Sequence, residues 1–205
     1  MLSRRFFRMV NNTDKKQKHT VQQLSFFPKS EPAPILWLMG PTSAGKSTIA
    51  EHLVDHLRGA GGAAIHLDGD QVRGYFGDLI RFADKDRLRV VETLADLAGR
   101  TSEAGLTTVV AALTAQEDAR RYVRQMLPDV IVIHVDCPID VCMERDPKGL
   151  YRKAIDGEIE TLIGYNEPYH PPQDPDMTID TNTRSIDDGV TDILDKLART
   201  RQEPR

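Results

Sequence analysis

Cysteine is scarce in this sequence of 205 residues, with only Cys137 and Cys142 present. We place Cys137 at the end of a predicted strand and Cys142 in the helix that follows, which makes a structural disulfide between them unexpected. This composition excludes a disulfide-stabilised secreted scaffold. It favours a reducing compartment, and we expect the protein to be cytoplasmic.

Long apolar runs and an excess of positive charge are also missing. No run approaches the roughly 20 apolar residues that a membrane-spanning helix needs. The formal net charge is -4, whereas nonspecific nucleic-acid binding requires a broad basic surface. We therefore expect neither a membrane nor a nucleic acid as a partner.

The first 33 residues differ from this acidic average. They carry seven basic side chains against two acidic ones, a net charge of +5, which leaves about −9 for the remainder. The segment is rich in proline near its end and has no sustained apolar period, so we predict that residues 1–33 form a basic, flexible arm. Its arginine-containing start also resembles a transit peptide, which keeps organelle targeting open beside a simple disordered tail.

From residue 34 to residue 205 the pattern is that of a single α/β domain. Short apolar runs alternate with amphipathic helical patterns, which is typical of a parallel sheet covered by helices. The predicted strands are residues 35–39, 63–67, 106–111, 130–135 and 177–179. Most of these strands are continuously apolar, as expected of strands that are buried on both faces.

The helix boundaries carry recognisable signals. Thr114 with Glu117, and Ser185 with Asp188, match the capping box that opens a helix, so we expect helices to begin there. Residues 146–176 fit no regular pattern and are rich in proline, glycine and charge. A long irregular segment within a domain is often a functional lid, and we predict a lid at about 146–176.

Residues 40–47 read Gly-Pro-Thr-Ser-Ala-Gly-Lys-Ser and match the phosphate-binding pattern G-x-x-x-x-G-K-S/T at every fixed position. The glycines let the backbone N–H groups face the phosphates, Lys46 reaches the β and γ oxygens, and the Ser47 hydroxyl binds Mg²⁺. The loop follows an apolar strand and precedes an amphipathic helix, whose positive end also favours phosphate. We therefore predict ATP and Mg²⁺ as cofactors. The predicted contacts in the loop are Gly40, Ser43, Ala44, Gly45, Lys46, Ser47 and Thr48.

Two carboxylates, Asp68 and Asp70, follow the second predicted strand. They stand at its carboxyl end, where open α/β sheets bind ligands. A carboxylate there can hold Mg²⁺ through water or accept the proton of an attacking hydroxyl. We predict that Asp70 and Lys46 are catalytic with Asp68 as helper, and that Ser47 and Asp70 contact the metal. The alternative is a turn in which an aspartate only caps the next helix.

Several further stretches resemble the adenylyl-sulfate kinase (adenosine 5′-phosphosulfate kinase) family. The most specific is Asp-Pro-Lys-Gly-Leu-Tyr-Arg-Lys-Ala at 146–154, and the similarity runs in order from about 35 to 197. The resemblance implies a P-loop NTPase-type, three-layer α/β/α fold with a five-stranded, mainly parallel sheet and a lid. It also implies transfer of the γ-phosphoryl group of ATP to the 3′-hydroxyl of adenosine 5′-phosphosulfate, and a possible homodimer.

The same resemblance implies roles for residues outside the loop. Arg145 and Lys148 of the basic lid suit the ATP phosphates, although a solvated basic turn is the alternative. Arg73 and Arg87 would hold the anionic groups of the acceptor, and Phe82 matches an aromatic residue beside its base. The acceptor-binding residues implied in this way are Arg73, Phe82, Arg87, Leu113, Thr114, Lys153 and Leu162.

Some acceptor-side positions depart from the family pattern. The family has an asparagine at the position of Val90 and a stacking phenylalanine at that of Leu162, and the two lost contacts together correspond to roughly 10-fold to 2000-fold in affinity. Tyr75, Tyr165 or Tyr169 could replace the stack. Otherwise the acceptor is another nucleotide, for instance a cytidine diphosphate derivative. A nucleotide-binding regulator is a third possibility, although no Asn-Lys-x-Asp guanine-recognition motif is present.

Overall fold

The computed structural model of the protein describes residues 31–80 and 83–202. Most of the predicted basic arm and Phe82 lie outside these described residues. Ala33, the last residue of the predicted arm, is hydrogen-bonded to the domain. The Ala33 N–H donates to the Ser102 carbonyl at 3.0 Å, and the Ala33 carbonyl accepts from the Ser102 hydroxyl at 2.5 Å. The folded unit therefore begins at Pro32, slightly before the predicted boundary.

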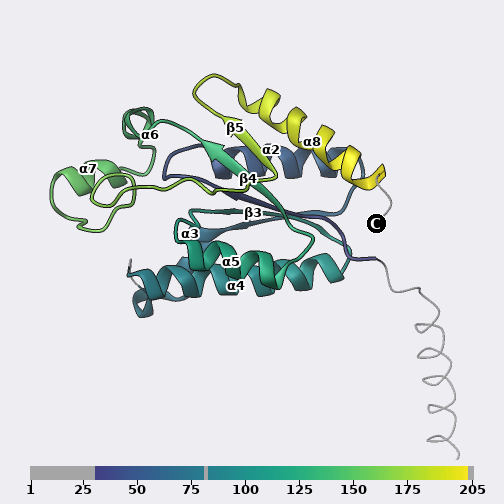
Figure 1. Ribbon diagram of the computed structural model, residues 1–205, viewed down its shortest axis with the longest axis horizontal. Helices are drawn as coiled ribbons and strands as arrows, with labels where there is room; N and C mark the ends of the chain where they lie inside the picture. Colours follow the sequence, from purple (N-terminus) through teal and green to yellow (C-terminus); the bar gives the residue numbers. More distant parts are fainter. Residues whose placement is uncertain (1–30, 81–82, 203–205) are drawn as a thin grey trace, which may run out of the picture. The chain divides into compact units, whose positions relative to one another are not determined.

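Five strands form one sheet, and all four neighbouring pairs run parallel (Figure 1). The strands are β1 (Ile35–Met39), β2 (Ala64–Asp68), β3 (Thr107–Ala112), β4 (Ile131–Asp136) and β5 (Met177–Asp180). Each lies within one or two residues of its prediction, and the spatial order is β2-β3-β1-β4-β5. The chain leads from β1 toward β2 on one side and later toward β4 on the other, so the loop after β1 lies where a parallel sheet opens a ligand-binding crevice.

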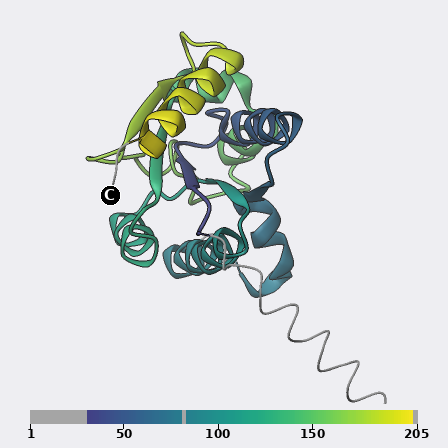
Figure 2. The ribbon, with the colours of Figure 1, turned by 90° about the vertical axis from the view of Figure 1, so that its right-hand side faces the viewer.

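Side chains that alternate along β1 enter two separate cores. Leu36 and Leu38 pack with helices α2 (Lys46–Gly59) and α8 (Ile186–Gln202), whereas Trp37 and Met39 pack with α4 (Asp84–Glu103) and α5 (Glu117–Met126). Figure 2 shows these two helix layers on opposite sides of the twisted sheet. The predicted three-layer α/β/α fold is confirmed, and the double burial explains why the strands are continuously apolar.

The two predicted capping boxes have different outcomes. Ser185 opens α8 as expected, because its hydroxyl oxygen accepts from the Asp188 N–H at 3.1 Å. The prediction for Thr114 is wrong, because α5 begins after Gln116 without a side-chain cap. The Thr114 hydroxyl instead accepts from the Trp37 indole N–H at 3.0 Å, and its backbone adopts a φ of 42°.

The segment predicted as a lid contains one short helix and otherwise irregular chain. Helix α6 (Ile139–Arg145) leads into it, α7 (Leu150–Ile155) forms its first part, and the chain then returns to β5. In Figure 1, α6 and α7 lie beyond the carboxyl ends of the strands. The lid therefore stands on the side of the sheet where the phosphate loop and the carboxylates also lie.

The described cysteines and helices bear on two of the composition-based expectations. Cys137 and Cys142 are both buried and free, as predicted. None of the helices between residues 31 and 202 that the structure describes is long and apolar enough to cross a membrane.

Candidate active site

The phosphate loop packs directly against β4, and this contact requires glycine at its start. A Cβ atom on Gly40 would lie 2.2 Å from the Val135 carbonyl oxygen, far inside contact distance. Ser43 and Gly45 have φ values of 65° and 95°, and this left-handed backbone curls the loop around a central space. The curl delivers Lys46 into the first turn of α2, at the positive end of the helix.

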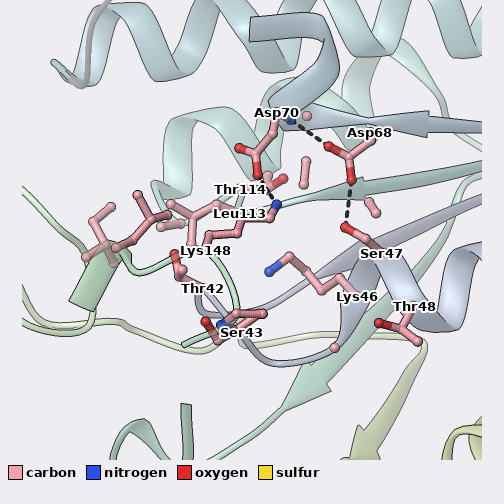
Figure 3. A pocket seen from close by; sticks show the side chains of 18 of the residues that line it. Thr42, Ser43, Lys46, Ser47, Thr48, Asp68, Asp70, Leu113, Thr114 and Lys148 are labelled. Atoms are coloured by element: carbon pink, nitrogen blue, oxygen red, sulfur yellow. Dashed lines mark hydrogen bonds and ion pairs between the residues drawn. The ribbon is translucent and has the colours of Figure 1, made fainter. Parts of the chain in front are cut away.

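Lys46 extends from the start of α2 into the cavity (Figure 3). Its ammonium donates to the carbonyl of Pro41 at 2.7 Å, across the loop. Desolvation lowers the pKa of Lys46 to about 8, although the negative charge of Asp70 opposes the shift. The lysine is therefore held by a neutral carbonyl and stands to gain from an anionic partner.

Asp68 ends β2, and its carboxylate accepts hydrogen bonds from two neighbouring segments at once. One carboxylate oxygen accepts from the N–H groups of Asp70 and Gln71, at 2.8 and 3.3 Å, and so caps α3 (Gly69–Tyr75). The other oxygen accepts from the Ser47 hydroxyl at 2.6 Å. Burial by itself raises the pKa of Asp68, but the hydrogen bonds from Ser47, Asp70 and Gln71 together bring it below its ordinary value.

This arrangement refines the predicted roles of the two carboxylates. The capping alternative is correct for Asp68, which in addition stands beside the predicted metal ligand Ser47. Asp70 does not contact Ser47 through any described hydrogen bond. Its carboxylate instead pairs with the Lys148 ammonium from the lid, as Figure 3 shows. Desolvation lowers the pKa of Lys148, but the hydrogen bond to Asp70 and the negative charges of Asp70, Asp68 and Glu51 together outweigh it, so the pKa is raised.

The charged and hydroxyl side chains described so far line one cavity of about 600 Å³. They are Lys46, Ser47, Asp68, Asp70 and Lys148. On the β5 side of the phosphate loop its wall consists of residues that follow β4 and β5, and we call this the β5 half. It comprises Arg145, Thr181, Arg184, Ser185 and Ile186. On the opposite side the wall consists of residues from α3, α4, the end of β3 and the lid, and we call this the α4 half. It includes Arg73, Arg87, Val90, Val91, Leu113, Thr114, Gln116, Ile159, Thr161, Leu162 and Ile163.

Most of the predicted site residues line this cavity. Those that do are Ser43, Gly45, Lys46, Ser47, Thr48, Asp68, Asp70, Arg73, Arg87, Leu113, Thr114, Arg145, Lys148 and Leu162. Gly40 and Ala44 are buried in the loop rather than in the cavity wall. Lys153 is exposed on α7 and does not reach the wall. The prediction for Phe82 falls outside the described residues.

The two arginines that approach the cavity from opposite halves already have partners. The Arg87 guanidinium donates to the carboxylates of Asp84 and Glu167, at 3.1 and 3.3 Å, and to the Thr161 carbonyl. It therefore connects α4 to the lid. Arg145 donates to the carbonyl oxygen of Thr181 at 2.7 Å and to its hydroxyl at 3.2 Å. These contacts fix the rim of each half.

Sequence reasoning did not assign roles to two residues that hold the phosphate loop from outside. The Thr181 hydroxyl donates to the Ala44 carbonyl at 2.9 Å, and the buried Tyr151 of α7 donates to the Thr42 carbonyl at 3.3 Å. Both residues belong to stretches that resemble the kinase family, which is the only sequence signal that could have identified them. Their contacts are formed by chain segments more than one hundred residues from the loop.

A phosphate loop with its lysine and serine, a carboxylate pair at the neighbouring strand end and a basic lid define a P-loop phosphotransferase. A family model for adenylylsulphate kinase matches residues 32–180 of the chain. The chain therefore belongs to the adenylylsulphate kinase family, as its motifs predicted.

Individual relatives agree with this assignment. The adenylyl-sulfate kinase of Deinococcus deserti is 38% identical over 163 residues, which cover 80% of this chain and 90% of that protein. The adenylyl-sulfate kinase of Clostridium kluyveri is 35% identical over 170 residues, covering 82% and 85%. Among solved structures, that of the Mycobacterium tuberculosis APS kinase CysC in complex with AMPPNP and APS matches with a TM-score of 0.79 and 30% identity, covering 82% of this chain and 99% of that one.

Proposed function

We propose that this protein transfers the γ-phosphoryl group of ATP to the 3′-hydroxyl of adenosine 5′-phosphosulfate, giving 3′-phosphoadenosine 5′-phosphosulfate. The observation that carries the proposal is the convergence of Lys46, the Ser47–Asp68 pair and the Asp70–Lys148 pair in one cavity. Family membership supports the choice of acceptor. The Mycobacterium tuberculosis relative was solved with AMPPNP and APS together, which are an ATP analogue and this acceptor.

ATP would bind with its phosphates in the loop and its nucleoside toward the β5 half. The curled backbone offers N–H groups, and Lys46 can exchange the Pro41 carbonyl for a phosphate oxygen. Arg145 stands at the rim of this half with its guanidinium fixed by Thr181. A cation held there in advance can contact a phosphate or stack on a base without losing much side-chain entropy.

The residues beside the loop fit Mg²⁺. The Ser47 hydroxyl and the Asp68 carboxylate are hard oxygen donors 2.6 Å apart, and the lowered pKa of Asp68 keeps it charged near neutral pH. Magnesium at kinase sites is held by one or two such groups together with substrate phosphates and water, so a larger protein cage is not needed. The bound ion would neutralise charge on the β- and γ-phosphates. We accordingly assign Asp68, rather than Asp70, as the carboxylate at the metal.

Asp70 is then left to act on the acceptor. It projects into the cavity between the phosphate loop and the α4 half, where it can orient the 3′-hydroxyl and accept its proton. Lys148 holds this carboxylate from the lid. Because phosphoryl transfer depends mainly on in-line positioning and charge neutralisation, a lid lysine next to both the carboxylate and the transferred group serves both needs.

A panel of acceptors tests this function. ATP consumption is followed in a coupled assay with adenosine 5′-phosphosulfate, with cytidine diphosphate derivatives and without an acceptor. We expect adenosine 5′-phosphosulfate to give the highest kcat/KM. Turnover of a cytidine nucleotide but not of adenosine 5′-phosphosulfate would show that the proposed acceptor is wrong and that the cytidine nucleotide takes its place. Tight ATP binding without turnover of any acceptor would instead favour a regulator.

A further inference from the structure

The α4 half of the cavity is lined mainly by aliphatic side chains, which limits how it can distinguish one acceptor base from another. We infer that this half selects its acceptor by shape, with few side-chain hydrogen bonds to the base, so that purine nucleoside 5′-phosphosulfates other than that of adenosine also bind and react. This inference rests on the proposed function, since it assumes that the acceptor occupies the α4 half. It concerns the range of substrates rather than the reaction.

The wall of the α4 half is largely aliphatic. Val90 on α4 and Leu162 in the lid are only 4% and 7% exposed, even though both line the cavity. The other apolar members are Val91, Leu113, Ile159 and Ile163. A flat base between such side chains gains contact area on both faces, but aliphatic groups contribute no hydrogen bond to its edge.

Aromatic side chains do not compensate for this within the described parts of the chain. No cavity-lining residue among residues 31–80 and 83–202 is a phenylalanine, tyrosine or tryptophan. Tyr75 is 82% exposed and Tyr165 is 44% exposed, while Tyr169 stacks on His134 with ring centroids 6.1 Å apart. The three tyrosines that could have replaced a stacking residue therefore lie elsewhere.

Apart from Thr161, the polar side chains of this wall are largely engaged with protein partners. Arg87 donates to two carboxylates and a carbonyl, as described above. The Gln116 amide nitrogen donates to Asp84 at 2.7 Å, and the Thr114 hydroxyl accepts the Trp37 indole N–H at 3.0 Å. Arg73 lies close to Asp70 and carries the positive charge that a 5′-phosphosulfate requires. Its charge suits the anionic group of the acceptor rather than the edge of the base.

The expected size of the effect follows from how pockets discriminate. A site built to hydrogen-bond a polar group rejects an analogue that lacks the group by about 10⁴- to 10⁵-fold, whereas a hydrophobic pocket rejects an isosteric analogue by only about 100-fold. Adenine and hypoxanthine have nearly the same shape and differ in the amino or oxo group at one edge. The aliphatic wall therefore predicts discrimination of about 100-fold or less between them.

The test compares the 5′-phosphosulfates of adenosine and inosine on the full chain. Binding of each to the complex with AMPPNP and Mg²⁺ is measured by calorimetry, and kcat/KM of each with ATP is measured separately. Affinities within about 100-fold support the inference, while a difference of about 10⁴-fold or more overturns it. If both bind alike and neither is phosphorylated, the proposed function fails and the expected reaction of the inosine compound fails with it, while the inference that binding selects the base by shape stands.

A matched pair of variants tests the wall itself. An asparagine amide can add a hydrogen bond to the edge of adenine, so Val90→Asn should raise the preference for the adenosine compound by about 2- to 12-fold, the equivalent of one added hydrogen bond. Val90→Ala removes the same apolar side chain without adding an amide and should leave the preference unchanged. Equal preferences in the two variants, at undiminished AMPPNP affinity, would contradict the inference.

Discussion

At the scale of single residues, the ionisation of Lys46 is linked to nucleotide binding. Phosphate oxygens favour the charged ammonium, and desolvation has lowered the pKa of this lysine to about 8 in the free protein. Affinity for AMPPNP should therefore be nearly constant below this pKa and weaken above it, by up to about tenfold per pH unit. Titration calorimetry from about pH 7 to about pH 9.5 measures the change.

The matched variant for this prediction is Lys46→Arg. A guanidinium stays charged throughout this pH range, so the variant should lack the break near pH 8 even if its affinity is lower at every pH. A break that persists in the variant would assign the titration to another group.

We expect the chemical step to depend most on Asp70. Replacing its carboxylate by an amide removes the proton acceptor but keeps the shape, so Asp70→Asn should lower kcat by about 10²- to 10⁴-fold. AMPPNP affinity should change little, because the phosphate loop and the Ser47–Asp68 pair remain. Asp195→Asn, an exposed substitution on α8 outside the cavity, is the control. Near-normal kcat in Asp70→Asn would refute its assignment as the base.

At the scale of secondary-structure elements, Asp68 connects β2, α3 and the start of α2. Asp68→Ala removes the α3 cap and should lower the free energy of unfolding by about 1–2 kcal/mol, while also raising the Mg²⁺ concentration needed for half-maximal activity. Asp68→Asn keeps an oxygen that can cap α3. It should therefore also raise the Mg²⁺ concentration needed for half-maximal activity, but with a smaller loss of stability. Urea unfolding and Mg²⁺ titrations of both variants separate the two roles. Equal stability losses would mean that the cap does not act as described.

The strands were predictable because their signals are local. Each is an apolar run bounded by residues that break strands, and β1, β3 and β4 are buried on both faces, so neighbouring structure reinforces the preference of the sequence. The failure of Thr114 to cap α5 was not predictable, since a partner on β1, the Trp37 indole, competes for the same hydroxyl. Local rules fail where such a distant side chain offers a better hydrogen bond.

Lys153 lies outside the cavity wall for a different reason, which is local to α7. Within α7, Tyr151 and Ala154 are buried, and residues three apart share a helix face. That spacing turns Arg152 and Lys153 toward solvent. Helical periodicity would have predicted this outcome had the lid been recognised as containing a helix.

At the scale of the whole molecule, the site joins segments from residue 42 to residue 186. The phosphate loop could be recognised from sequence alone because its chemistry lies within eight consecutive residues. Contacts between distant segments could not be recognised from the sequence alone. Arg87 bonding to Glu167 and Thr181 holding the Ala44 carbonyl depend on the parallel strand order, which brings carboxyl-end loops to one edge.

The central claim is transfer to one particular hydroxyl. The most direct measurement incubates the protein with ATP, Mg²⁺ and adenosine 5′-phosphosulfate and locates the new phosphate by phosphorus–proton correlation in NMR spectra. We expect a single product phosphorylated at the 3′ position, formed about 100-fold or more slowly when Asp70→Asn replaces the wild type under the same conditions. A phosphate at any other position, or no product while another acceptor is phosphorylated, would contradict it.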